Sequence, residues 1–368
     1  MNLICSREEL LNNINIVMKA VSTKTTLPIL ECILITADEN GFKLTSNDLE
    51  MGIETKSIEA NIINNGKVAI EARIFSEIIR KVNGEEVEII CDENNYKITI
   101  KSGTSIFNIS GQSGEDFPLL PIVDKNNEYK LFQADLRDMI RQTIFSIAQD
   151  ETRPILAGEL LEINSGYISM VSVDWYRISY KKTYLLSSTE DNSVIVPGKT
   201  LNEISKILNS DGEESVTLYF TDKHIIFETD KFIIVSRLIE GEYIKYAQSF
   251  TDDYKTRIIT SRIELLSSLE RATLVSRESK KTPIRFNIQH GDMEISSNAE
   301  MGSLNEMLSI DCEGDDIKIA FNPKYLIDAL KAIEDDNILI QFNTSLSPCI
   351  IRPTEGSEYK YLILPLRV

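Results

Sequence analysis

The feature that most constrains the fold of this chain is a pattern that occurs three times. Each copy begins with a short alternating strand, followed by a small or polar residue and an amphipathic helix. The copies span residues 3–20, 129–148 and 257–275, so their starts are separated by about a third of the 368-residue chain. A second segment with a strand, a helix and a further strand follows each copy, at residues 68–90, 194–218 and 317–340. The repeat predicts three tandem domains of one fold with two helices each.

The runs that follow the helices alternate between apolar and polar residues, as in residues 97–101 and 232–235. Such runs are typical of half-buried strands, and helices followed by antiparallel strands predict an α+β class with helices on one face of each sheet. Polar residues interrupt the pattern at 124–128 and 248–253. We therefore expect domains at residues 1–126, 127–250 and 251–368. The outermost domains would carry unpaired edge strands, which a second subunit could pair.

The distribution of charge modifies the first impression given by the net charge. With 57 acidic and 39 basic residues the chain carries −18, which by itself argues against a nucleic-acid partner. The six predicted helical segments taken together are nevertheless net positive. If all the helices lined one side of a curved assembly, that side would attract DNA phosphates, and contact would be weak, salt-dependent and blind to base sequence. The alternative is that these helix flanks are ordinary solvated faces.

Motifs for catalysis or metal binding are hard to find in the sequence. A Gly-rich phosphate loop is absent, and we expect His224 and His290 to be surface turn residues. The five cysteines form no Cys-x-x-Cys pair and are expected to be free thiols. Asp48 and Glu50 could share one face of a strand as a metal or acid–base pair, but no third ligand type lies nearby, so we favour a role in a turn.

These observations favour a binding or scaffold protein that is not an enzyme and has no cofactor or metal. The alternative from another class is a metal-dependent nuclease that uses Asp48 and Glu50. The first residues carry charges where a signal peptide needs an apolar core, and no run of 18 apolar residues occurs, so we expect a cytoplasmic protein with no membrane span.

Five short motifs occur in a fixed order along the whole chain. They are TLPIL at residues 26–30, LTSNDLEM at 44–51, EDFP at 115–118, VIVP at 194–197 and LPLRV at 364–368. Together they resemble the bacterial DNA polymerase III beta subunit family, the sliding clamps. The resemblance implies a processivity factor: a head-to-tail homodimer closed into a ring around duplex DNA, with helices inside and sheets outside.

The resemblance also implies site residues. Phe107, Leu274 and Val275 match positions at the dimer seam. The positions that match or neighbour the DNA-facing wall are Lys24, Arg73, Arg80, Lys81, Gln149, Lys199, Arg277 and Lys280. Lys24 stands where an arginine is common in the family, and Gly198 stands where an arginine is usual. Fewer forked phosphate contacts predict weaker retention per residue without loss of encirclement.

In this family, partner proteins insert a short peptide into an apolar cleft. The matching positions here are Arg153, Leu156, Val173, Asp174, Trp175, Tyr176, Arg177, Ile178, Tyr243, Ile244, Leu362, Leu364, Pro365, Leu366 and Arg367. The implied partners are the polymerase alpha subunit, the clamp loader and other proteins with a clamp-binding motif. The family usually has Asp-Gly-His-Arg where residues 174–177 read DWYR, and often a proline at Ile244. Trp175 and Tyr176 are expected to reshape the pocket, so a specialised paralogue with other partners is the alternative.

Overall fold

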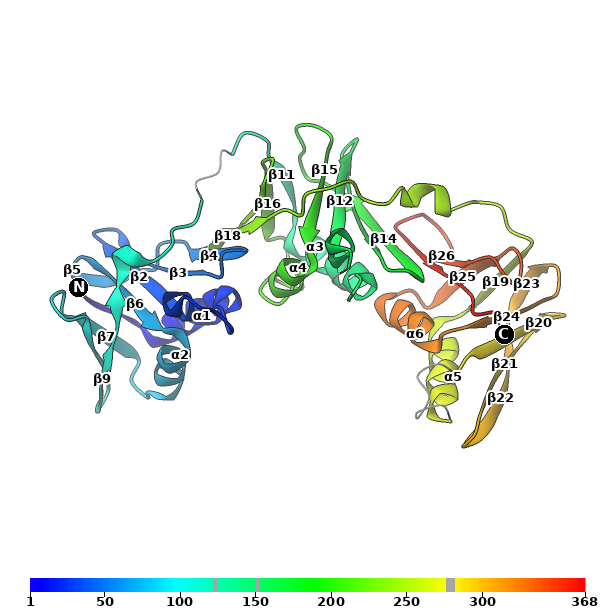
Figure 1. The fold of residues 1–368 in the computed structure, drawn as a ribbon, viewed down its shortest axis with the longest axis horizontal. Helices are drawn as coiled ribbons and strands as arrows, with labels where there is room; N and C mark the ends of the chain where they lie inside the picture. The colour runs from blue at the N-terminus through cyan, green and yellow to red at the C-terminus, as the bar shows by residue number, and fades with distance from the viewer. Residues whose placement is uncertain (122–124, 150–151, 276–281, 368) are drawn as a thin grey trace. The chain divides into compact units, whose positions relative to one another are not determined.

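The computed structural model describes residues 1–121, 125–149, 152–275 and 282–367. Within these ranges it contains α-helices at each of the six places where the repeats predict one (Figure 1). They are α1 (Arg7–Val17), α2 (Ala72–Lys81), α3 (Gln133–Thr143), α4 (Gly198–Ile204), α5 (Arg262–Leu274) and α6 (Pro323–Ala332). No helix among the described residues combines the length and apolar character that crossing a bilayer requires.

The helix starts follow from local side-chain capping. The Ser6 hydroxyl accepts a hydrogen bond from the Glu9 N–H at 3.4 Å, and Ser261 caps α5 through Glu264 in the same way. A side-chain oxygen at this position satisfies one of the amide groups that the first helical turn leaves unpaired. The middle copy differs, since α3 begins before Ala134 and has no side-chain cap.

Contacts divide the chain into two compact units, one formed by residues 1–131 and 214–238 and the other by residues 132–213 and 239–368. The first unit contains a five-stranded antiparallel sheet, β5-β1-β7-β8-β9, and a nine-stranded sheet, β10-β6-β2-β3-β4-β18-β17-β16-β11. Their strands are β1 (Asn2–Ser6), β2 (Cys32–Asp38), β3 (Gly41–Asn47), β4 (Met51–Thr55), β5 (Asn61–Asn64), β6 (Gly66–Glu71), β7 (Glu86–Cys91), β8 (Lys97–Ser102), β9 (Ser105–Ser110), β10 (Gln112–Ser113), β11 (Tyr129–Phe132), β16 (Ser215–Phe220), β17 (His224–Glu228) and β18 (Phe232–Arg237).

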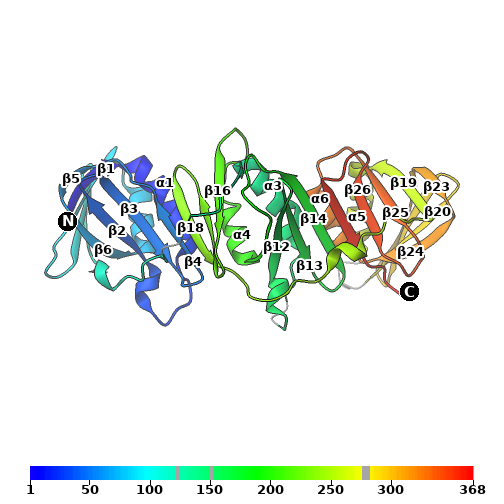
Figure 2. The same cartoon turned by 90° about the horizontal axis from the view of Figure 1, so that it is seen from above.

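The second unit contains another nine-stranded sheet, β15-β12-β13-β14-β27-β26-β25-β19-β23, and a four-stranded sheet, β22-β21-β20-β24. Figure 2 looks onto the larger sheet, from β12 and β13 through β14 to β26 and β25. The strands are β12 (Gly158–Asn164), β13 (Tyr167–Val173), β14 (Arg177–Tyr184), β15 (Asn192–Pro197), β19 (Thr256–Ser261), β20 (Ile284–Gln289), β21 (Asp292–Ala299), β22 (Gly302–Ser309), β23 (Asp311–Gly314), β24 (Ile317–Phe321), β25 (Asn337–Phe342), β26 (Cys349–Pro353) and β27 (Tyr359–Ile363).

Each nine-stranded sheet contains strands from two neighbouring predicted domains. The joins are antiparallel pairs: β4 pairs with β18, and β14 pairs with β27. The α+β class with antiparallel sheets is therefore confirmed, and the sheets run continuously across the predicted domain borders. The division at residues 126/127 and 250/251 stays a prediction.

The apolar faces of the helices build the core. In the last repeat, α5 and α6 lie side by side and contribute Leu265, Leu269 and Leu326 to a buried cluster with Phe286 and Phe321 of the sheets (Figure 1). All five of these side chains are at most 1% exposed. Burying large apolar side chains of this kind is worth about 1.5 to 3 kcal/mol each, so this cluster holds the two helices against the sheets.

Candidate partner-binding cleft and nucleic-acid surface

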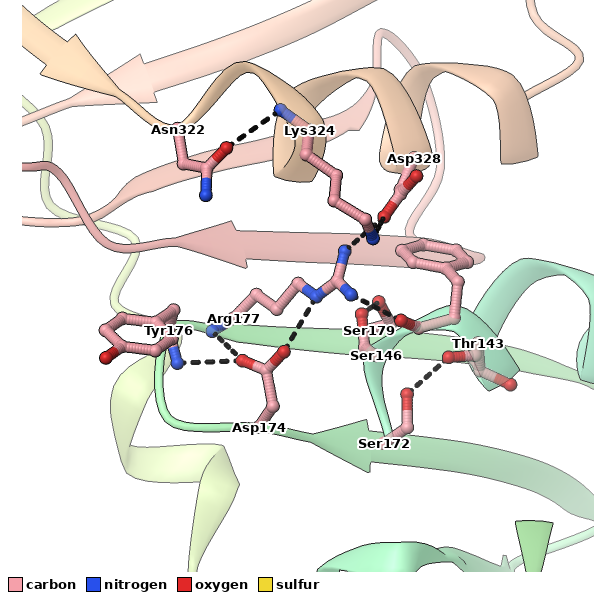
Figure 3. Close-up of polar contacts among 11 residues, drawn as sticks. Thr143, Ser146, Ser172, Asp174, Tyr176, Arg177, Ser179, Asn322, Lys324 and Asp328 are labelled. Atoms are coloured by element: carbon pink, nitrogen blue, oxygen red, sulfur yellow. Dashed lines mark hydrogen bonds and ion pairs between the residues drawn. The ribbon is translucent and has the colours of Figure 1, made fainter. Parts of the chain in front are cut away.

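Arg177 is the centre of a polar network that joins β14 to α6 (Figure 3). Its side chain is only 7% exposed. The guanidinium Nε donates to Asp174 Oδ2 at 3.0 Å, and Nη1 donates to Asp328 Oδ2 at 2.7 Å. The guanidinium also lies 4.6 Å from the centre of the Tyr325 ring. A buried charge of this kind is tolerated because each of its sides has a carboxylate, a carbonyl or an aromatic partner.

The loop between β13 and β14 presents two aromatic side chains to solvent. Asp174 Oδ1 accepts hydrogen bonds from the N–H groups of Tyr176, at 2.8 Å, and Arg177, at 3.0 Å. This turn leaves Trp175 and Tyr176 each 50% exposed. The Arg153 guanidinium lies 4.2 Å from the Trp175 ring centre, and Tyr176 stacks on Tyr325 with ring centres 5.8 Å apart. The two residues that depart from the family pattern therefore have defined packing partners.

An apolar cluster lies beside this loop. It includes Leu156, Val173, Ile178, Tyr243 and Leu362, which the sequence resemblance assigned to one cleft. All five are less than a tenth exposed, so they form the floor of the candidate cleft more than its open surface. Burial raises the pKa of the Tyr243 hydroxyl, which therefore remains a donor, with the carbonyls of Val171 and Gly158 at 3.2 and 3.3 Å.

The C-terminal segment forms one rim of the candidate cleft. The Leu364 N–H donates to the Tyr176 carbonyl at 2.8 Å, and the Leu366 N–H donates to the Ala320 carbonyl at 2.7 Å. Leu364 is 38% exposed and Ile244 is 42% exposed. These two residues, with Trp175 and Tyr176, supply the exposed apolar surface on which a peptide side chain could pack.

The fifteen residues assigned to the cleft thus fall into three groups. Those exposed are Arg153, Trp175, Tyr176, Ile244, Leu364 and Arg367; those buried are Leu156, Val173, Arg177, Ile178, Tyr243 and Leu362; those between are Asp174, Pro365 and Leu366. Sequence reasoning missed Tyr325 and Asp328 of α6, which complete the Arg177 network. The only signal for them was the capping residue Asn322 followed by a proline at the start of that helix.

The candidate DNA-facing residues that the structure describes are all exposed: Lys24, Arg73, Arg80, Lys81, Gln149 and Lys199. Arg277 and Lys280 lie outside the described residues. Arg80 and Lys81 each approach Glu77, at 3.8 and 3.2 Å, and such exposed pairs are weak enough for a phosphate to compete with them.

Gly198, at the start of α4, stands where the family usually has an arginine. A Cβ atom there would lie 2.5 Å from Ile147 Cδ1 and 2.9 Å from the Ala157 carbonyl oxygen. A side chain at this position requires its neighbours to move, so the glycine fits the packing around α4.

Of the candidate seam residues, Phe107 lies on an edge strand, and Leu274 and Val275 lie at the C-terminal end of a helix. Phe107 is 36% exposed on β9, an edge strand, and its neighbour Ile106 is 63% exposed. Leu274 is 54% exposed at the end of α5, and Val275 is half-buried. These positions are available for contact with another chain, although their role at a seam stays a prediction.

The alternative catalytic pair has a structural role. Asp48 Oδ1 accepts hydrogen bonds from the N–H groups of Glu50, at 3.0 Å, and Met51, at 2.8 Å, which confirms the predicted turn between β3 and β4. His290 lies in a turn with a φ of 54°. The prediction for His224 was wrong: it begins β17 because its backbone continues the ladder with Arg237 of β18, and partial burial lowers its pKa.

Among the residues that the structure describes, no three His, Cys, Asp or Glu side chains come together in a group that could hold a metal ion. The five cysteines are free, and four of them, Cys5, Cys32, Cys91 and Cys349, are buried. Burial raises the pKa of the Cys349 thiol to about 12. These thiols therefore behave as small apolar side chains.

Comparison with known proteins gives consistent similarity over the whole chain. Models of the N-terminal, central and C-terminal domains of the DNA polymerase III beta subunit match residues 1–121, 130–245 and 248–367. A beta sliding clamp of Halalkalibacterium halodurans is 33% identical, with both chains covered completely. Among solved structures, a putative DNA polymerase III beta subunit from Eubacterium rectale has a TM-score of 0.96 at 45% identity, covering 100% of both chains. The sliding clamp of Bacillus subtilis has a TM-score of 0.96 at 33% identity, covering 100% of this chain and 99% of that one.

Proposed function

Because this chain belongs to the DNA polymerase III beta subunit family, we propose that it is a sliding clamp: a non-catalytic accessory subunit that encircles duplex DNA and keeps a replicative polymerase on its template. Two copies form the ring. The observation that carries the proposal is that the sheets of successive repeats are joined each time through strands in the same positions.

The two joins within the chain connect equivalent strands of successive repeats. In the first repeat, β4 is the last strand of the series β6-β2-β3-β4. In the second repeat, β14 is the last strand of the equivalent series β15-β12-β13-β14. The partners β18 and β27 likewise end the runs β11-β16-β17-β18 and β23-β19-β25-β26-β27. The strands in the same positions that lack a second neighbour among the described residues are β22, which pairs only with β21, and β9, which pairs only with β8. Pairing β22 of one copy with β9 of another repeats the pattern of these joins.

Strand number and exposure support this pairing. The sheets that end in β9 and β22 have five and four strands, which together equal the nine strands of each internally joined sheet. Every residue of β9 and β22 is at least partly exposed, whereas most of β18 and β27 is buried. Two such head-to-tail contacts close a ring of two copies and remove both free edges.

The DNA contact in this proposal is made through phosphates. Arg73 and Lys199 are exposed in the first turns of α2 and α4, and Lys24 is exposed in the loop that follows α1, so these cations can contact phosphates, which carry no sequence information. Retention then depends on encirclement, and the weak contacts permit sliding. The net charge of −18 keeps nucleic acid away from the rest of the surface.

The cleft beside Trp175 provides the tether. A partner whose peptide is anchored there is held near the primer end at a high effective concentration, so it rebinds before it diffuses away. We propose that the polymerase alpha subunit, the clamp loader and other proteins with a clamp-binding motif use this cleft, and that they do so in the cytoplasm.

The test is retention on DNA with and without free ends. The chain is loaded by its clamp loader and ATP onto nicked circular DNA, separated from free protein in high salt, and one half of the sample is linearised. We expect retention on the circle and rapid release from the linear form, since only topology holds the ring. Equal release from both forms contradicts encirclement.

A further inference from the structure

A pocket of ≈ 730 Å³ lies on the face of the four-stranded sheet opposite the core. Alternation along β20 explains its lining: Phe286 points into the core and is 1% exposed, whereas Arg285 is exposed and Asn287 half-buried. Asn287 faces Glu294 of β21 on one side and Lys318 of β24 on the other. The floor of this pocket, called here the sheet groove, is thus a row of polar side chains.

The charge of the sheet groove is opposite to that of the chain. Arg285, Lys318 and Arg367 line it with a single carboxylate, Glu294. That carboxylate is already engaged, because Asn287 donates to its Oε2 at 3.0 Å and Asn305 to its Oε1 at 2.7 Å. These hydrogen bonds, with Lys318 nearby, lower the Glu294 pKa. Arg285 and Arg367 form no ion pair with any other residue that the structure describes.

The groove continues directly from the candidate cleft. The segment from Leu364 to Arg367 has its first hydrogen bond to Tyr176, in the cleft, and its second to Ala320, which lines the groove. Leu366 and Arg367 also line the groove, and Leu346, 68% exposed, adds an apolar edge. An extended chain rises about 3.3 Å per residue, so a peptide anchored in the cleft needs only a few more residues to reach the cations.

We propose that the sheet groove binds acidic residues that flank the apolar anchor of a cleft-bound partner peptide. The inference rests on the proposed function and adds a specificity element to it. Carboxylates of the peptide pair with Arg285, Lys318 and Arg367, and the arginines can bind them in a forked geometry. On a chain that is otherwise strongly acidic, this site selects partners with an acidic flank and rejects those with a basic one.

The experiment uses five synthetic peptides and the full-length protein. One peptide is the C-terminal ten residues of the polymerase alpha subunit from the same organism; the others add four glutamates or four glutamines, placed at either end in turn. Binding is followed by the fluorescence of Trp175, which is the single tryptophan of the chain. The double variant Arg285→Gln/Lys318→Gln is compared with Lys97→Gln/Lys223→Gln, which removes the same charge from exposed positions in the other compact unit.

We expect the glutamate peptide to bind wild type about tenfold more tightly than the glutamine peptide at low salt. The advantage should persist in the control variant, disappear in the Arg285/Lys318 variant and fade near 0.5 M salt, where the Debye length falls to about 4 Å and charges farther apart than that are largely screened. The proposal for the sheet groove is wrong if the glutamate and glutamine peptides bind wild type equally well. It is also wrong if the glutamate peptide still binds the Arg285/Lys318 variant more tightly than the glutamine peptide does. Either result leaves the proposed function standing. Failure of every peptide to bind wild type contradicts the cleft and the groove together.

Discussion

At the scale of single residues, Glu159 is the group whose surroundings most determine its chemistry. It is fully buried on β12, and its Oε2 lies 2.6 Å from the Thr143 hydroxyl. That hydroxyl also lies 2.8 Å from the Met139 carbonyl, and it has only one proton to donate. If the proton goes to Met139, the carboxyl of Glu159 must itself be the donor. Burial agrees with this assignment, since it raises the Glu159 pKa to about 8.

The buried acid makes stability depend on pH. In the unfolded chain Glu159 ionises near its ordinary pKa of 4.5, whereas the folded chain keeps the proton until about pH 8. The stabilising contribution is therefore complete below pH 4.5 and is lost as pH rises to 8, by up to about 1.4 kcal/mol per pH unit. We expect Glu159→Gln to flatten this slope in urea unfolding between pH 6 and 8, and the exposed control Glu213→Gln to retain it. An unchanged slope in Glu159→Gln contradicts the neutral carboxyl.

At single residues, the sequence predicted a position correctly where a short motif identifies it. It failed where the side chain's contact partner lies far away in the sequence. The family motif located Asp174, Trp175 and Arg177 beside one another. It gave no sign that Arg177 binds Asp328, 151 positions away, because no local pattern encodes that contact. The exposure of Trp175 follows from a turn whose hydrogen bonds only the coordinates reveal.

At the scale of elements, Arg177 fastens the start of β14 to α6. The variant Arg177→Ala removes the buried cation that pairs with both Asp174 and Asp328. It leaves Asp328 with the exposed Lys324 ammonium, at 2.8 Å. Removing one partner of a buried pair typically costs about 3 to 5 kcal/mol. We expect a loss of that size in chemical unfolding, with faster amide exchange at the first turn of α6. The control Arg153→Ala removes an exposed arginine that stacks on Trp175, and its loss should stay below about 1 kcal/mol. Similar losses for both variants contradict the fastening role.

The edge strand β9 is the element that the proposed ring uses. Ile106 is 63% exposed on β9, and Ile63 is 51% exposed on β5, the other edge of the same sheet. A glutamate at position 106 places a charge in a contact that must exclude water, so Ile106→Glu should convert the dimer to a monomer in light scattering. Ile63→Glu makes the same change at an edge outside the contact and should leave the dimer intact. A dimeric Ile106→Glu, or a monomeric Ile63→Glu, contradicts the β9–β22 pairing.

Helices were the elements easiest to predict, because the same spacing recurs in three copies and Ser6 and Ser261 mark their starts. Strand partners were not predictable in the same way. An alternating run shows that one face is buried but contains nothing about which strand lies beside it, so β4–β18 and β14–β27 emerged only from the coordinates.

At the scale of the whole molecule, the sequence predicted a repeated α+β fold and a family, and both are confirmed. The basic inner wall remains a prediction that follows from the net positive helices and from the exposed Lys24, Arg73 and Lys199. The sheet groove could not be predicted at all, since its lining comes from the three strands β20, β21 and β24, the segment after β25 and the C-terminal segment. Residues so widely separated have no common sequence signature.

The continuity of the nine-stranded sheets has a mechanical consequence. Pulling the chain apart at β4–β18 or β14–β27 breaks a ladder of backbone hydrogen bonds while the peptide backbone itself still spans the break. At the proposed β9–β22 contact no covalent bond joins the two strands directly, so once their hydrogen bonds break the two copies are connected only through the other contact of the ring. A clamp loader that pulls on the proposed ring would therefore open it at the β9–β22 contact. The β4–β18 and β14–β27 joins within each chain would stay closed and transmit the force to that contact.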